Sequence, residues 1–333
     1  MTILENHSLK AHHTFGLDVR ARYWAQYAGV DELVELLHRF ADQPKCFIGE
    51  GSNLLFTGDF DGIVLHSAMC RAAALNETDT EVLIEAQSGL KMDELIEQLA
   101  AMQLYGLENL SYIPGQVGAA AVQNIGAYGV EVKDCIDSVK TLDLSTFETR
   151  IFNCEECQYG YRDSFFKREG KGRYVITAVR FRVSKTPILH LDYGNLHSCL
   201  AGIDNPSPEQ VRQAVIAIRK QKLPEVDEYG SAGSFFKNPV IAAPLYDTLH
   251  AQYPDMPSFV TSNGYKIPAA WLIEQCGWKD KQSGRATVWQ QQPLVIVNNG
   301  NATAEDILQL AQQITDSVNE RFHIQLEREV EYI

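Results

Sequence analysis

Hydrophobic residues recur at helical spacing in two stretches of the first half of the chain, residues 33–40 and 92–102. Both patterns predict amphipathic helices, because apolar residues three and four positions apart share one helix face. Short apolar runs at residues 46–49, 63–66 and 82–85 predict strands. The first half of the chain is therefore expected to consist of short strands interrupted by two helices.

Turn-forming residues at 201–208 predict a boundary, and a clear helix start follows them. Ser207 can cap this helix, Pro208 suits its first position, and Gln210 completes a capping box. The apolar stripe expected on the helix consists of Val211, Val215 and Ile218. The basic residues expected to complement its carboxyl end are Arg219, Lys220 and Lys222.

Three further patterns complete the prediction of secondary structure. Residues 174–183 and 326–332 alternate in the manner of half-buried strands, and a helix is expected to begin near Thr303. The residues expected to face inward from that helix are Ile307, Leu308, Ala311, Ile314 and Val318. The whole pattern predicts an α+β protein with at least two domains.

Composition and charge narrow the classes of function. The chain has 333 residues and a formal net charge of −14, which disfavours binding to nucleic acid because a polyanion is repelled. No apolar run approaches the roughly 20 residues of a membrane span, and no signal peptide is visible. The seven cysteines are scattered and odd in number, which favours reduced thiols and a cytoplasmic location.

Two further patterns bear on a metal site. Cys154 and Cys157 form one C-x-x-C pair without a second ligand pair, and the two glutamates between them would raise the thiol pKa values. The histidines show no metal-binding spacing. We expect structural thiols and no metal.

Two glycine-rich segments are candidates for ligand binding. Residues 49–53 (Gly-Glu-Gly-Ser-Asn) follow a predicted strand, where glycines let the backbone approach an anion, although a tight turn is the better explanation of this pattern taken alone. Residues 112–129 consist mainly of glycines and small residues that cannot fill a core by volume. A planar cofactor with a pyrophosphate tail fits such a segment, and the alternative is a loop between packed domains.

Several motifs, in this order, make the chain resemble the UDP-N-acetylenolpyruvoylglucosamine reductases, whose FAD-binding part has the vanillyl-alcohol-oxidase (PCMH) type of fold. The segments that carry the resemblance to the FAD-binding part are residues 13–16, 49–53, 113–115 and 123–129. Those that resemble the catalytic segments are residues 159–167, 233–239 and 326–330. Residues 191–196 (Leu-Asp-Tyr-Gly-Asn-Leu) resemble the tyrosine-bearing loop of the first type of this family.

The resemblance implies the fold and the reaction. It implies an FAD-binding region of two subdomains at residues 1–200, completed by a strand at about 324–333, and a substrate-binding α+β domain at 205–323. It also implies an enzyme of peptidoglycan precursor synthesis that uses FAD and NADPH to reduce UDP-N-acetylglucosamine enolpyruvate to UDP-N-acetylmuramate. Hydride would pass from flavin N5 to C3 of the enolpyruvyl group. We expect a monomer.

The resemblance also assigns roles to residues. Catalysis falls to Ser234, which donates a proton to C2, and to Arg162 and Glu329, which stabilise the enolate. Contacts to the substrate are expected from Tyr193, Lys222, Lys237, Asn238 and Gln292. Contacts to FAD are expected from Gly49, Glu50, Gly51, Ser52, Asn53, Leu54, Ser111, Ile113, Pro114, Gly115, Val117, Gly118, Gln123, Asn124, Ile125, Gly126, Ala127 and Tyr128.

Each catalytic residue also has a simpler interpretation. Ser234 could lie in an ordinary turn before an aromatic strand, and no G-x-S-x-G pattern supports a hydrolase nucleophile. Arg162 could form a surface ion pair with Asp163 instead of gripping a substrate carboxylate. Glu329 shares its expected strand face with two other glutamates, which could all be solvated.

Two departures from the family pattern and two rival functions remain open. Phe259 stands where many members carry a tyrosine near the uridine, and Arg328 replaces a usual proline. Lys222 could serve only the helix dipole. The rival functions are a flavin oxidase on the same fold and a non-catalytic protein that binds UDP-sugars.

Overall fold

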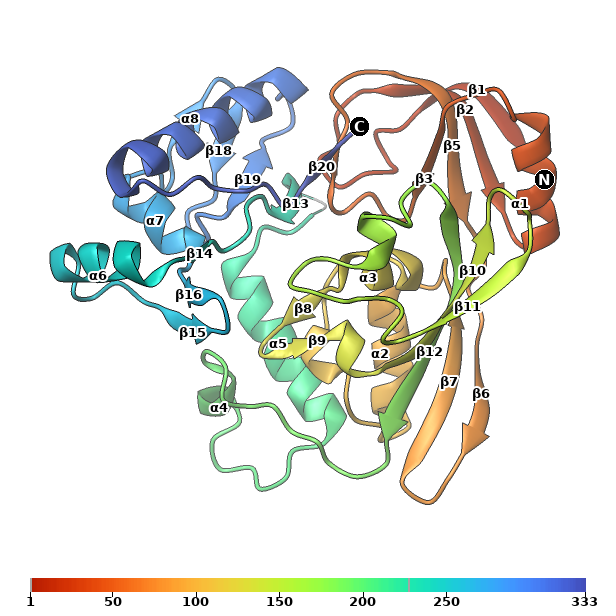
Figure 1. Ribbon diagram of the computed structural model, residues 1–333, viewed down its shortest axis with the longest axis horizontal. Coiled ribbons are helices and arrows are strands. Elements are labelled where there is room, and N and C mark those ends of the chain that lie inside the picture. Colours follow the sequence, from red (N-terminus) through yellow and green to blue (C-terminus); the bar gives the residue numbers. More distant parts are fainter. Residues whose placement is uncertain (1, 227) are drawn as a thin grey trace. The chain divides into compact units, whose positions relative to one another are not determined.

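The structure, a computed structural model, describes residues 2–226 and 228–333 and divides into two compact units (Figure 1). The first unit contains the chain up to His7 and the segments Ala21–Glu50 and Asp61–Arg219. The second unit contains Ser8–Arg20, Gly51–Phe60 and Lys220–Ile333. The chain therefore passes repeatedly from one unit to the other, and the turn-rich segment 201–208 lies inside the first unit.

A four-stranded sheet with one covering helix begins the first unit. The strand order is β1 (Ile3–Ser8), β2 (Arg20–Tyr27), β5 (Phe60–Ser67) and β3 (Lys45–Ile48). Helix α1 (Val30–Arg39) buries Leu33, Leu36 and Leu37 in one core with Ile63 and Leu65 of β5. The apolar faces of helix and sheet thus explain why these segments pack together. The predicted helix at 33–40 and the strands at 46–49 and 63–66 are confirmed.

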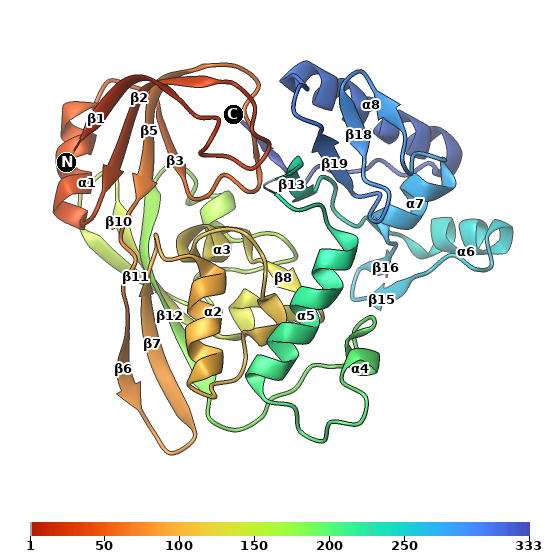
Figure 2. The same cartoon turned by 180° about the vertical axis from the view of Figure 1, so that it is seen from behind.

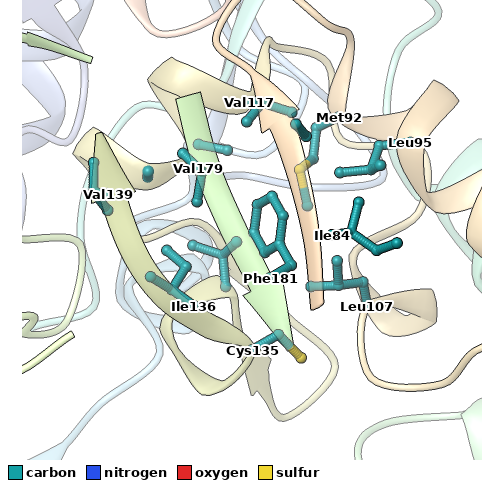
Figure 3. Close-up of a cluster of buried hydrophobic side chains, with 14 of the residues drawn as sticks. Ile84, Met92, Leu95, Leu107, Val117, Cys135, Ile136, Val139, Val179 and Phe181 are labelled. Atoms are coloured by element: carbon teal, nitrogen blue, oxygen red, sulfur yellow. The ribbon is translucent and has the colours of Figure 1, made fainter. Parts of the chain in front are cut away.

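A five-stranded antiparallel sheet forms the larger part of the first unit (Figure 1). The strand order is β11 (Thr149–Asn153), β10 (Ile136–Asp143), β12 (Tyr174–Ser184), β7 (Glu81–Gln87) and β6 (Ala72–Glu77). Helices α2 (Met92–Ala101) and α3 (Val117–Gln123) pack their apolar residues against it. Figure 3 shows Phe181 of β12 among Ile84, Met92 and Leu95 in this core.

Strand β12 differs from its predicted half-buried pattern, because almost every residue in it is buried. Ile176 and Phe181 pack into the core with α2, whereas Val175 packs into the separate core with α1. Both faces of the strand are therefore covered near its start. A strand buried on two faces cannot be told from a half-buried strand by periodicity alone.

Short elements and one long helix complete the first unit. The short elements are η1 (Glu108–Leu110), β8 (Gly126–Ala127), β9 (Val130–Glu131), η2 (Val132–Asp134), η3 (Phe165–Lys167) and α4 (Leu196–Cys199). Helix α5 (Pro208–Lys222) begins with the predicted capping box, in which the amide of Gln210 donates to Ser207 Oγ over 3.3 Å. Figure 2 shows α5 beside α2, and buried Arg212 forms an ion pair there with Asp93.

The second unit consists of small sheets with three helices. One sheet has the order β13 (Gly230–Ser234), β19 (Val295–Asn298), β18 (Ala286–Val288) and β17 (Gln282–Ser283). Another has the order β14 (Val240–Ile241), β16 (Gly264–Lys266) and β15 (Phe259–Thr261). The helices are α6 (Ala243–Gln252), α7 (Ala269–Gln275) and α8 (Ala304–Phe322). Thr303 caps α8, which confirms the predicted start, and Leu310 is more deeply buried than the predicted Leu308.

The end of the chain differs from the single strand predicted at residues 326–332. Only β20 (Glu331–Tyr332) is regular, and it pairs in parallel with β4 (Leu54–Leu55). The residues before it form an extended segment that pairs with Phe236 at one isolated bridge, through Arg328. Arg328 is exposed whereas Leu326 and Val330 are buried, so the strand-like alternation predicted for residues 326–332 does not hold along this segment. The segment changes partners along its length, and such changes interrupt a regular alternation.

The capping box of α8 provides a test of local stability. Thr303 Oγ1 accepts a hydrogen bond from the amide of Asp306 over 3.2 Å. We expect Thr303→Ala to lower the free energy of unfolding by about 1 kcal/mol, because one helical amide loses its partner. Urea unfolding followed by circular dichroism measures this loss. Thr80→Ala, in an exposed turn, is the control, and equal effects of both substitutions would contradict the role of the cap.

Candidate active site

The two glycine-rich segments meet within the first unit. The carboxylate of Glu50 accepts a hydrogen bond from the amide of Gly115 over 2.6 Å. Gly49 lies against Gln116, whose Oε1 would be 3.2 Å from a side-chain Cβ at position 49. Gln116 is in turn within 3.4 Å of the ring of His66 on β5. Residues 49–50 and 115–116 therefore form one surface, although they are far apart in the sequence.

The small residues of segment 112–129 serve two different purposes. At Gly118 a Cβ would lie 2.9 Å from the Cβ of Ser88, so this glycine allows α3 to pack against the protein itself. Ala119, Ile125 and Ala127, in contrast, retain accessible surface. Apolar surface of this kind beside a core fits a planar cofactor. Packing against Ser88 is thus sufficient to explain Gly118, and the predicted contacts of this segment with FAD remain predictions.

A network around Asp93 of α2 holds the start of the same segment. The carboxylate accepts a hydrogen bond from the amide of Tyr112 over 2.6 Å and another from Arg212 over 3.0 Å. Tyr112 has a φ of 60°, which is the left-handed region that a tyrosine rarely adopts. The Nε of Arg219 donates to the carbonyl of Tyr112 over 3.0 Å. Two arginines of α5 and one carboxylate of α2 therefore hold the backbone of Tyr112 in this conformation.

Arg162 lies against the glycine-rich segment. Its guanidinium donates to the carbonyl of Gly126 over 2.6 Å, and a Cβ at position 126 would be 3.0 Å from Nη1. Asp163, which the simpler interpretation paired with Arg162, forms an ion pair with Arg168. The predicted role of Arg162 toward a substrate carboxylate remains a prediction. A larger residue at position 126 would need either this guanidinium or the carbonyl of Val130, also 3.0 Å from such a Cβ, to shift.

A second cation lies in the electrostatic range of Arg162. Burial lowers the pKa of the Arg219 guanidinium, Tyr128 and Asp93 raise it, and the positive charge of Arg162 lowers it further. Burial raises the pKa of the Tyr128 phenol, and the charge of Arg219 opposes that shift. Arginine stays protonated in proteins, so the first unit has a local positive field despite the net charge of the chain. Such a field favours anionic ligands.

Ser234 and Glu329 lie on neighbouring segments of the second unit. The amide of Glu329 donates to the carbonyl of Phe235 over 2.8 Å, which places residue 329 beside the residue that follows Ser234. The pairing of β13 with β19 is interrupted between Ser231 and Ser234, where Gly233 has a φ of 68°. This bulge re-aims the serine, which stays partly accessible. A glycine is needed at 233 because other residues are strained at that φ.

The remaining residues of the first glycine-rich segment belong to the second unit. A Cβ on Gly51 would lie 2.5 Å from the backbone of His12, so only glycine fits there. The side chain of buried Asn53 donates to the carbonyl of Glu329 over 3.1 Å. Ser52 and Leu54 lie on either side and are partly exposed. Asn53 thus supports the backbone on which a candidate catalytic carboxylate is mounted.

The predicted substrate contacts have different surroundings. Lys237 pairs with Glu327 over 3.4 Å, and Asn238 Oδ1 accepts from the amide of Ala269 at the start of α7 over 2.9 Å. The carbonyl of Lys222 accepts from the indole of Trp289 over 3.1 Å. The side chains of Lys222, Tyr193 and Phe259 are exposed, and that of Gln292 is partly buried. Lys222, Lys237, Asn238 and Gln292 belong to the second unit and Tyr193 to the first.

The structure also describes the cysteines and possible metal ligands. All seven cysteines are free thiols. Burial, with a smaller contribution from the nearby charge of Glu156, raises the pKa of the Cys157 thiol to about 12. No group of three or more metal-ligating side chains occurs among residues 2–226 and 228–333. No helix in those same ranges is long and apolar enough to span a bilayer.

Family models match both parts of the chain. Residues 23–150 match the FAD binding domain family, and residues 224–333 match the C-terminal domain of UDP-N-acetylenolpyruvoylglucosamine reductase. The predicted fold class, a vanillyl-alcohol-oxidase-type FAD-binding domain with a C-terminal α+β domain, is therefore confirmed. The chain is an FAD-binding oxidoreductase.

Full-length relatives identify the family. A UDP-N-acetylenolpyruvoylglucosamine reductase from Bacteroides fragilis is 43% identical over 331 residues, 99% of each chain. Another, from Pseudomonas syringae pathovar tomato, is 45% identical over 97% of this chain and 96% of its own. A solved structure of the reductase from Thermus caldophilus has a TM-score of 0.70, with 24% identity, 99% coverage of this chain and 98% coverage of its own. The chain belongs to the UDP-N-acetylenolpyruvoylglucosamine reductase family.

Some residues that shape the site escape analysis of the sequence. Arg219 is expected only to complement a helix dipole, yet it binds the carbonyl of Tyr112. Asp93 and Arg212 look like ordinary surface charges on amphipathic helices until α2 and α5 lie side by side. A charged residue within the apolar stripe of α5, one position after Val211, is the one available sign of the buried pair.

The ion pair between Asp93 and Arg212 yields a prediction about stability and flavin retention. Asp93→Leu should lower the free energy of unfolding by about 3 kcal/mol, because it leaves a buried guanidinium without its carboxylate. The amide of Tyr112 loses its acceptor as well, so the variant should also release FAD more readily. Urea unfolding and the absorbance of flavin retained after dialysis measure the two effects.

The double variant Asp93→Leu/Arg212→Leu is the matched control for this prediction. It removes both charges, so we expect it to be more stable than Asp93→Leu alone. If the two substitutions instead lower stability additively, the ion pair does not stabilise this region in the way proposed.

Proposed function

We propose that this protein reduces UDP-N-acetylglucosamine enolpyruvate to UDP-N-acetylmuramate, with FAD as cofactor and NADPH as the source of electrons, in the cytoplasmic synthesis of peptidoglycan precursors. The reaction is that named for its relatives, which match it along nearly their whole length. The observation that supports the proposal is the hydrogen bond from the amide of Glu329 to the carbonyl of Phe235, which joins the segments of two predicted catalytic residues within one unit.

The residues proposed to hold FAD are those of the two glycine-rich segments, 49–54 and 111–128. Their support is the link between Glu50 and Gly115 and the accessible apolar surface of Ala119, Ile125 and Ala127. FAD, when bound, supplies a hydride to C3 of the enolpyruvyl group. The local positive field of Arg162 and Arg219 favours the pyrophosphate and carboxylate groups of the ligands.

Ser234 is proposed to deliver the proton that completes the reduction. A hydroxyl is a weak acid, so it can protonate C2 only where the acceptor is strongly basic and water is excluded. Its place after a bulge with Gly233 supports the role, because a bulge fixes the direction of the side chain. After the transfer, the serine is proposed to recover its proton from solvent.

Arg162, and Glu329 as a protonated carboxyl that donates a hydrogen bond, are proposed to stabilise the negative charge that develops at C2 and on the adjoining carboxylate. A guanidinium can form two parallel hydrogen bonds to a carboxylate. Its bond to the carbonyl of Gly126 fixes its orientation beforehand, so little reorganisation is required when charge develops. The residues proposed to contact the substrate are Tyr193, Lys222, Lys237, Asn238 and Gln292.

The proposed function predicts two separate electron transfers. The purified protein should be yellow, NADPH should bleach it without oxygen, and the enolpyruvyl sugar nucleotide should restore the colour. Anaerobic stopped-flow spectroscopy measures both steps, with UDP-N-acetylglucosamine, which has no double bond to reduce, as the control. A flavoprotein that is reoxidised rapidly by oxygen and not by this sugar nucleotide would instead be an oxidase.

Substitution of Ser234 tests the proton donor. Ser234→Ala should leave bleaching by NADPH nearly intact and slow reoxidation by the sugar nucleotide by at least about a hundredfold, because general acid catalysis contributes about that much. The control is Ser231→Ala, three residues earlier on the same strand. Equal losses in the two half-reactions of Ser234→Ala would argue against a role for this residue in proton transfer.

The sequence shows no nicotinamide-type dinucleotide fingerprint, and this predicts how the two substrates bind. NADPH and the sugar nucleotide should use one pocket in turn, which gives parallel lines in double-reciprocal plots and substrate inhibition by each. Initial rates over a grid of both concentrations provide the measurement. Intersecting lines without inhibition would show that both substrates bind together.

A further inference from the structure

Asn109 links two segments of the first unit that are proposed to contact ligands. It belongs to the 3-10 helix Glu108–Leu110 and is 2% exposed. Its side-chain amide donates to the carbonyl of Tyr128 over 2.9 Å and to the carbonyl of His190 over 2.7 Å. Both donors of this buried amide are therefore used on backbone groups. One acceptor belongs to the glycine-rich segment and the other to the loop that presents Tyr193.

That loop is anchored to α5 by apolar residues on both sides of Tyr193. The residues that form this cluster are Leu189, Leu191, Leu196, Leu200, Tyr128, Val211, Val215 and Ile218. Tyr193 itself remains 51% exposed, and its ring stands edge-on to Tyr128 with centroids 6.4 Å apart. The apolar anchors fix the ends of the loop. They do not fix the position of Tyr193 relative to the glycine-rich segment, because apolar contacts are not directional.

The hydrogen bonds of Asn109 supply that missing direction. A buried amide with two short bonds holds its acceptors within tenths of an ångström, and breaking either bond leaves a buried carbonyl unsatisfied. The residue after Tyr128 also lies in van der Waals range of Tyr193. This residue, Gly129, has a φ of 82°, and a Cβ on it would be 3.7 Å from the Cβ of Tyr193.

We propose that Asn109 is a positioning residue, which holds the Tyr193 loop in register with the flavin-binding segment and so places Tyr193 for contact with the sugar nucleotide. The proposal rests on the proposed function, because Tyr193 has a role in binding only there. Asn109 touches neither ligand in this scheme and acts through the backbone at residues 128 and 190.

Hydrogen–deuterium exchange tests the register of the loop without any substrate. In Asn109→Leu, which keeps the bulk and removes both donors, peptides from residues 186–200 should exchange about tenfold faster than in the unaltered protein. Peptides from β12 and α2 should be unchanged. Thr141→Val is the matched control, since it removes a buried hydrogen bond of the same unit, to the carbonyl of Arg150 over 3.0 Å. If Asn109→Leu does not fold, Asn109→Ser, which retains one donor, carries the same test.

Kinetics then test whether the register matters for binding. Asn109→Leu should raise the KM for the sugar nucleotide about tenfold while the flavin spectrum stays unchanged. Tyr193→Ala should raise that KM strongly in the unaltered protein and little in the Asn109→Leu background, since the tyrosine is already misplaced there. Additive effects of the two substitutions would overturn the proposal.

The outcomes separate this proposal from the proposed function. Loop exchange that is equal in Asn109→Leu and in the unaltered protein overturns the positioning role whatever the enzyme reduces. An unaltered protein that does not reduce the sugar nucleotide overturns the proposed function instead. Faster exchange throughout the unit, with no preference for residues 186–200, would show that Asn109 only stabilises the fold, and it too would overturn the positioning role.

Discussion

The glycine-rich segment of the first unit depends on the hydrogen bonds that the carboxylate of Asp93 accepts. It joins α2 to α5 through Arg212 and holds the amide of Tyr112, whose backbone is in a conformation that costs a tyrosine about 1 kcal/mol or more. The glycine-rich segment starts at this point. Its conformation is therefore set by a buried charge pair rather than by the flexibility of its glycines, and ligands meet a surface that is already formed.

The sequence predicts elements well where one periodicity prevails and poorly where partners change. The capping boxes at Ser207 and Thr303 mark α5 and α8 because the interactions involved span only three residues. β12 and the segment 326–332 are misjudged because their burial depends on elements far away in the sequence. A local pattern cannot reveal that a second layer covers a strand, or that a segment pairs with two strands in succession.

The same distinction applies to the site. The residues of the motifs are found by resemblance, and the structure places Ser234 beside the Glu329 segment and Arg162 against Gly126. The residues that hold those motifs are not found, since Asn109 and Arg219 act on backbone carbonyls. Every residue has a backbone carbonyl. The residue that accepts the hydrogen bond can therefore be of any type, and the sequence does not mark the contact.

The interleaving of the chain has a consequence for how the protein is made. Residues 8–20 and 51–60 leave the ribosome early, yet their partners in the second unit lie near residues 231, 298 and 331. The amide of Ser231 donates to the carbonyl of Thr14, and β4 pairs with β20. Because these partners are synthesised much later than residues 8–20 and 51–60, the second unit cannot complete its native contacts when only the early segments have emerged. Until then the early segments lack their native partners, which is a condition that favours aggregation of a nascent chain.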